Sequence, residues 1–82
     1  MSNPVTSAIN HIGLSRLGRR LGCRPSNVQV WRDHGRLPQT DLAGLTSYAV
    51  TIEEMCEGKW TAEQLLEATR EAWIERRSLG IL

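Results

Sequence analysis

The stretch Leu14–Arg32, LSRLGRRLGCRPSNVQVWR, decides the fold. Its apolar residues recur at helical spacing on both sides of Gly22, which predicts two short helices joined by a tight turn. Gly22 supplies the positive φ that such a turn needs, and Gly18 leaves room where the two helices touch. The positions that fit the spacing of a helix-turn-helix are Leu17, Gly18, Leu21, Gly22, Cys23, Val28 and Trp31.

Helical spacing continues on both sides of this stretch, whereas strand signals are scarce. Prolines at first-turn positions and glycines at the ends bound the segments, and Thr61–Gln64 (TAEQ) forms a capping box. We expect helices over 4–12, 15–21, 25–34, 42–57 (with a break near 46–47) and 61–79, the fourth capped by Thr40 or Asp41 and the last ended by Gly80. The chain is therefore predicted to be all-α, a compact bundle of about five helices in one domain, 1–82.

The composition fits a small soluble globular protein, with 40% apolar residues in 82 and a net charge of +1. The sequence has no apolar run of about 18 residues and no secretory signal, so we expect no membrane partner and a cytoplasmic location. Cys23 and Cys56 are not at metal-ligand spacing and are expected as reduced core residues, Cys23 more firmly than Cys56. We expect no enzyme, metal, cofactor or small-molecule substrate, because there is no catalytic constellation and no phosphate loop.

Charge is unevenly placed along the chain. Residues 1–40 hold six arginines against Asp33, a net of +5, whereas residues 41–82 hold eight acids against four bases, a net of −4. Arginine is suited to bidentate contacts with phosphate and guanine. The asymmetry indicates a basic face for a polyanion, although an Arg-rich solvated surface would give the same count.

The stretch Leu14–Arg32 resembles the helix-turn-helix of the lambda repressor and Cro superfamily. The continuation Trp31–Pro38, WRDHGRLP, is similar to the ending of the motif in small Cro-like and YdaS-like phage or prophage regulators. The resemblance covers about residues 4–58. Gly18 stands where this family usually has Ala, and Pro25 stands where many relatives have Ser, Gln or Lys, which leaves the specificity open.

The resemblance implies a sequence-specific regulator of transcription, a repressor, that binds double-stranded DNA in a bacterial host cell, associated with the nucleoid. The second helix of the motif would lie in the major groove. The residues implied to read bases are Arg24, Ser26, Asn27, Gln29 and Val30. Those implied to contact phosphates are Ser15, Arg16, Arg19, Arg32 and Arg36. Two have plain alternatives: Asn27 as a local hydrogen-bonding residue, and Arg19 as a solvated side chain.

Such regulators bind palindromic operators as two-fold pairs, so a homodimer is expected. The final helix carries more apolar residues than the rim of a small domain requires, and its acidic outer face is expected to stay clear of DNA. The predicted dimer contacts are Leu66, Trp73, Ile74 and Leu79. The alternative is that this helix only covers the monomer core. Two other functions stay open: an antitoxin that represses its own operon, and a helical protein-interaction module without a DNA role.

Overall fold

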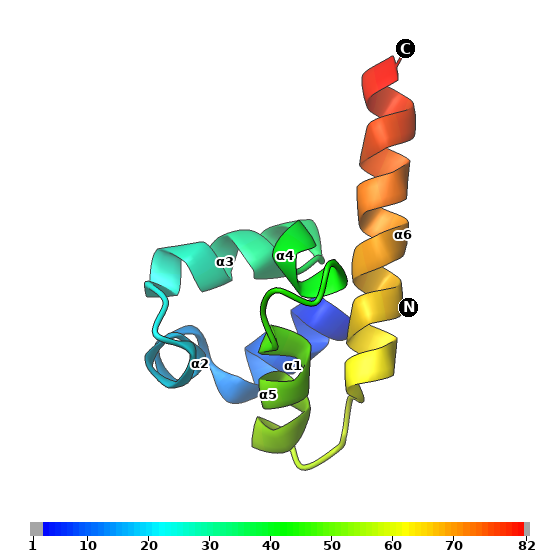
Figure 1. Ribbon diagram of the computed structural model, residues 1–82. Helices are drawn as coiled ribbons and strands as arrows, with labels where there is room; N and C mark the ends of the chain where they lie inside the picture. The colour runs from blue at the N-terminus through cyan, green and yellow to red at the C-terminus, as the bar shows by residue number, and fades with distance from the viewer. Residues whose placement is uncertain (1–2, 82) are drawn as a thin grey trace.

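The computed structural model describes the backbone of residues 3–81 and the side chains of residues 3–75, and within that part it contains helices and no strand. Figure 1 shows a globule formed by the helices that come first in the chain, with the last helix, α6, standing along one side of it. The helices are α1 (Pro4–Ile12), α2 (Leu14–Leu21), α3 (Pro25–His34), α4 (Gln39–Leu42), α5 (Tyr48–Met55) and α6 (Ala62–Ile81). The all-α fold is confirmed, with six helices among the described residues in place of the expected five or so.

The first helix, α1, has the expected boundaries. Its cap is Asn3, whose Oδ1 accepts from the backbone N–H groups of Val5 at 2.8 Å and Thr6 at 3.2 Å. These bonds satisfy two of the donors that a helix start leaves without a partner. The helix also ties into the end of α3, because the Thr6 hydroxyl donates to the carbonyl of Arg32 at 2.7 Å.

The turn between α2 and α3 follows the expected geometry. Gly22 adopts φ 72° and ψ 25°, the left-handed conformation that a side chain would strain. Gly18 lies in α2 where the chain returns toward it: a Cβ there would be 2.8 Å from the carbonyl oxygen of Cys23. The contact is with backbone, so it leaves no room for even a methyl group. This explains why glycine rather than alanine occupies this position.

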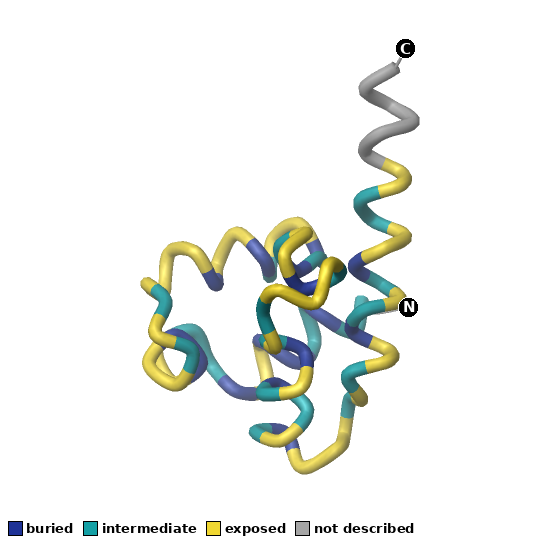
Figure 2. The backbone as a smooth tube through the Cα atoms, in the orientation of Figure 1, coloured by how far each residue is buried: buried dark blue, intermediate teal, exposed yellow. Residues whose placement is uncertain are grey.

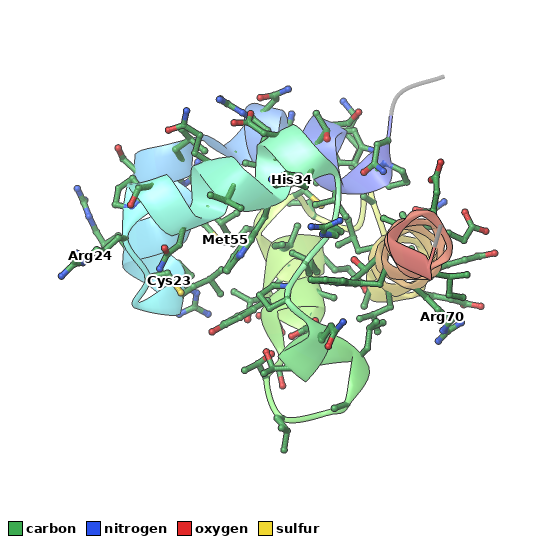
Figure 3. All side chains as sticks on the ribbon, turned by 90° about the horizontal axis from the view of Figure 1, so that it is seen from above. Cys23, Arg24, His34, Met55 and Arg70 are labelled. Atoms are coloured by element: carbon green, nitrogen blue, oxygen red, sulfur yellow. The ribbon has the colours of Figure 1, made fainter. Side chains whose placement is uncertain are left out.

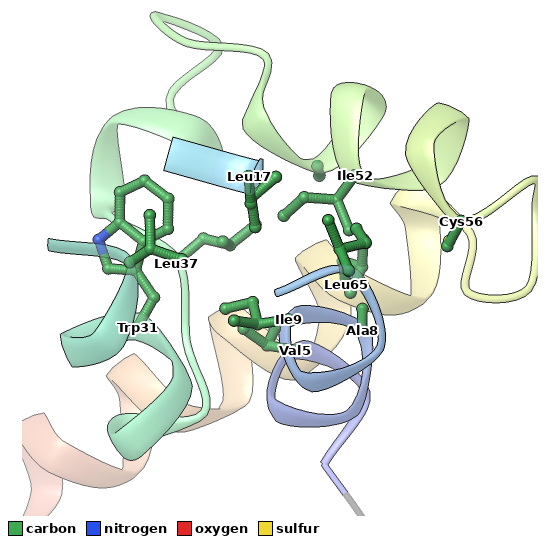
Figure 4. Close-up of a cluster of buried hydrophobic side chains, with 12 residues drawn as sticks. Val5, Ala8, Ile9, Leu17, Trp31, Leu37, Ile52, Cys56 and Leu65 are labelled. Carbon is green, nitrogen blue, oxygen red and sulfur yellow. The ribbon is translucent and has the colours of Figure 1, made fainter. Parts of the chain in front are cut away.

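A cluster of apolar side chains from α1, α2, α3, α5 and α6, from the segment before α4 and from the end of α5 forms the core (Figure 4). The buried hydrophobic residues are Val5, Ala8, Ile9, Ile12, Leu17, Val28, Trp31, Leu37, Ala49, Ile52, Cys56 and Leu65. Two of the expected motif residues, Leu21 and Cys23, are only half-buried at its edge. Cys23 therefore packs against the core without being fully buried, whereas Cys56 is buried.

The segment expected as one helix over 42–57 is two helices, α4 and α5, broken near the expected position. Asp41 does not cap the first of them, which begins at Gln39. Its buried carboxylate instead accepts from the backbone N–H of Tyr48 at 2.7 Å and of Ala49 at 3.0 Å, and from the Thr46 hydroxyl at 2.6 Å. Asp41 therefore caps α5 from a distance and fixes the bend between the two helices.

The last helix begins with the expected capping box. The Thr61 hydroxyl accepts from the backbone N–H of Gln64 at 3.2 Å, and the Gln64 side chain accepts from the backbone N–H of Thr61 at 2.9 Å. The expected end at Gly80 is wrong, since α6 continues to Ile81. Figure 1 shows the C-terminal half of α6 extending past α3, which gives the molecule the shape of an L.

Candidate nucleic-acid interface

The third helix, α3, turns one face inward and leaves the other open. Val28 and Trp31 are buried beneath it, whereas Ser26, Asn27, Gln29 and Val30 are exposed. Figure 2 shows this division, with the buried turns of α3 facing the globule and the exposed turns facing outward. Four of the five side chains that were expected to read bases are thus brought together on a single accessible surface.

The open surface begins at Arg24, the residue before α3. Arg24 has extended backbone and serves as the N-cap, and Pro25 occupies the first helical position. Figure 3 shows the Arg24 side chain pointing away from the body at one end of α3, with His34 near the other end. The N-terminus of α3 adds the positive end of the helix dipole to the charge of Arg24.

The second helix contributes hydroxyl and cationic groups beside this surface. Ser15, Arg16 and Arg19 are all exposed on α2. Arg20 is exposed too, and its guanidinium lies 3.9 Å from the carboxylate of Glu54. Exposed ion pairs at this distance contribute little to stability, so the arginines of α2 mainly give this side of the molecule a positive field.

Two of the expected phosphate contacts are already engaged within the protein. The Nε of Arg32 lies 3.3 Å from the carboxylate oxygen of Asp33, and Arg32 is half-buried. The guanidinium carbon of Arg36 lies 4.1 Å from the ring centroid of Trp73 on α6. Both residues therefore have protein contacts that hold them near α3, rather than extending freely into solvent.

A hollow of about 310 Å³ lies between α3 and the segment that carries α4 and α5. Its floor includes the stacked rings of Trp31 and Tyr48, whose centroids are 5.0 Å apart. The hydrogen bond from Cys23, together with burial, raises the pKa of the Tyr48 hydroxyl above its ordinary value. The hollow is lined by Cys23, Asn27, Val30, Trp31, Pro38, Thr40 and Tyr48. Thr40 and Tyr48 could not be placed here from the sequence, because the bend fixed by Asp41 brings them beside α3.

The expected dimer contacts on α6 fall in different environments. Ile74 is 58% exposed and lines a groove of about 360 Å³ between α6 and α4, together with Leu42, Ala43 and Trp73. Leu66 is half-buried against the core. Trp73 is also half-buried, and its Nε1–H donates to the carbonyl of Leu37 at 2.8 Å, so it faces its own chain. Leu79 lies outside the residues whose side chains are described.

Within residues 3–75, no three His, Cys, Asp or Glu side chains come together in a group that could hold a metal ion. None of the helices in the described part combines the length and the apolar character needed to cross a membrane.

The fold and the surface together define a class of small all-helical protein in which two helices, joined by a tight turn, present one of them outward. A comparison with curated proteins finds the 8.4 kDa cro protein of Escherichia phage HK022, 28% identical over 74 residues, which covers 88% of this chain and 97% of that protein. No family model and no solved structure matches the chain. The match confirms the resemblance to Cro-type phage regulators and extends it beyond residue 58 into α6.

Proposed function

We propose that this protein is a sequence-specific regulator of transcription that binds double-stranded DNA with α3 in the major groove. The observation that carries the proposal is the open face of α3, on which Ser26 and Gln29 are exposed beside the arginines of α2. A protein of this kind needs no cofactor, since occupancy of a promoter by itself excludes RNA polymerase. The resemblance to a phage Cro protein favours repression.

The chemistry of the exposed side chains sets what each would do. Gln29 has the paired donor and acceptor that match adenine N6 and N7, and Val30, 51% exposed, can pack on a thymine methyl group. Arg24 can reach guanine or phosphate from the start of α3. Ser15, Arg16 and Arg19 would hold the backbone of the same half-site, which positions the protein without reading the sequence.

The sixth helix bears on how the duplex would sit. Its C-terminal half extends past α3 on the side that α3 exposes (Figure 1). A duplex seated on α3 would therefore have α6 beside it. The acidic residues of α6 would then act on the placement of the duplex through their charge.

Selection of duplexes from a random pool, followed by a salt titration of the selected sequence, tests the proposal. Binding through phosphate contacts predicts a steep linear fall of log affinity with log salt. Gln29→Ala should cost about 1–3 kcal/mol on the selected site and relax preference at one base pair, whereas Arg16→Ala should weaken all sequences alike. Equal losses on selected and random DNA for Gln29→Ala would remove Gln29 from the base-reading set. A protein without salt-dependent affinity would favour a protein-interaction module instead.

We also propose that two copies bind a palindromic site, with the groove between α4 and α6 as their contact. The support is the exposed Ile74 beside Leu42 and Ala43. Sedimentation at micromolar concentration, with and without DNA, measures the state directly. Ile74→Asp should weaken pairing, while Val50→Asp on α5, where Val50 is 50% exposed, serves as the matched control. A protein that stays monomeric on its selected site would contradict the pairing.

A further inference from the structure

The short segment between α3 and α4 is held in place by α6. The side chain of Leu37 in this segment is completely buried. Its backbone N–H donates to the hydroxyl of Thr69 at 3.1 Å, and its carbonyl accepts from Nε1 of Trp73 at 2.8 Å. Because buried backbone groups need such partners, α6 fixes the conformation of this segment as well as covering it.

The same tryptophan reaches the neighbouring residue, Arg36. The guanidinium carbon of Arg36 lies 4.1 Å from the centroid of the Trp73 ring, and both side chains are half-buried. A guanidinium is planar and its N–H donors lie in that plane, so stacking on a ring uses its face and no donor. The stack therefore sets the orientation of the guanidinium.

Arg36 is held at the edge of the surface that α3 exposes. A hollow of about 220 Å³ borders Arg36 and Trp73 on one side and Val30 and His34 of α3 on the other. Val30 belongs to the set of exposed residues proposed to read bases. A group bound along α3 would thus come within reach of the guanidinium near the C-terminal end of that helix.

We propose that Trp73 is a positioning residue that holds the Arg36 guanidinium ready for one backbone phosphate of the duplex read by α3. This inference rests on the proposed function. Trp73 acts through Arg36 and touches no DNA itself. A free arginine side chain loses rotamer freedom when it binds, and stacking has already restricted Arg36, so binding a phosphate costs less entropy.

The test measures the salt dependence of affinity for the selected duplex in the wild type, Arg36→Ala, Trp73→Leu and the double variant. Each single change should reduce the magnitude of the slope of log affinity against log salt by about 0.9 for each bound copy of the protein, the value for one phosphate contact per copy. The double variant should lose no more than either single variant. Trp73→Phe keeps a ring under the guanidinium and should retain the wild-type slope, although it lacks the N–H that binds Leu37.

Two results would overturn the inference while leaving the proposed function standing. One is a wild-type slope in a folded Trp73→Leu variant, and the other is additive losses in the double variant. If Trp73→Leu fails to fold, Trp73→Met replaces it, because methionine fills much of the same space without a ring. A wild-type protein whose affinity does not depend on salt would instead reject the proposed function, and this inference with it. Thermal unfolding of every variant separates these effects from a general loss of structure.

Discussion

Replacing Gly18 by alanine should destabilise the protein, although alanine is the better helix former. In a helix interior this change is ordinarily worth about 1 kcal/mol in favour of alanine. Here the new methyl group would meet the carbonyl oxygen of Cys23 at 2.8 Å and the backbone nitrogen of Pro25 at 3.4 Å. Neither contact can be relieved by turning a side chain, so the segment that joins α2 to α3 must move.

The expected magnitude follows from these two opposing terms. Overpacking in a closed site costs about 1–3 kcal/mol, and a neighbour made of backbone places the cost in the upper part of that range. After the gain in helix propensity, Gly18→Ala should lower the free energy of unfolding by about 1–2 kcal/mol. For a chain of this size, that corresponds to a fall in Tm of roughly 5–10 °C.

Urea and thermal unfolding followed by circular dichroism measure this change. Ser15→Ala, on the exposed side of the same helix, is the matched control and should stay within about 0.5 kcal/mol of the wild type. Because the displaced segment begins α3, affinity for DNA should fall together with stability in Gly18→Ala. A variant that is more stable than the wild type by about 1 kcal/mol would show that the turn has room for a methyl group, and the explanation of Gly18 would be refuted.

Three further changes test other parts of the structure. Asp41→Ala removes the carboxylate that accepts from three donors around the start of α5, and it should cost about 2–4 kcal/mol in urea unfolding, with Asp41→Asn recovering part of the loss. Thr69→Val keeps the shape but leaves the buried N–H of Leu37 without its acceptor, so a loss of about 1–3 kcal/mol is expected, and a neutral result would contradict the role given to this bond. The pKa of Tyr48 is raised in the folded protein, first by the hydrogen bond from Cys23. Its contribution to stability should be complete below about pH 10 and be lost as pH rises through the folded value, a decline that Tyr48→Phe should reduce in unfolding measured from pH 8 to 11.

The parts of the fold that could be predicted from sequence are those decided by local chemistry. Asn3 and Pro4 define the start of α1, and the Thr61–Gln64 box defines the start of α6, because both act through bonds to residues two or three positions away. The turn at Gly22 was predictable for the same reason. The exposed face of α3 then followed from the two buried positions, Val28 and Trp31, at helical spacing.

The parts that could not be predicted depend on contacts between distant segments. From the sequence, Asp41 was expected to cap the helix that follows it directly. It instead caps α5, whose first residue lies seven positions further along the chain. From the sequence, Trp73 was expected to be an apolar contact for a partner. Its indole N–H instead donates a hydrogen bond to the carbonyl of Leu37, 36 residues earlier in the chain. Helical periodicity carries no information about such pairings, since it reports which face of a helix is apolar and not what lies against that face.

The L-shaped outline has a consequence for how a rod-like molecule could be seated on the protein. Because α6 stands at one end of α3 and extends past it, a rod-like molecule can approach α3 from its exposed face or from its far end (Figure 1). The same molecule cannot approach α3 from the side that α6 occupies. α6 would thus fix the lateral position of the rod before any base pair is read. Truncating the C-terminal half of α6 should therefore widen the range of positions that a bound rod can take along α3, even where every residue of α3 is unchanged.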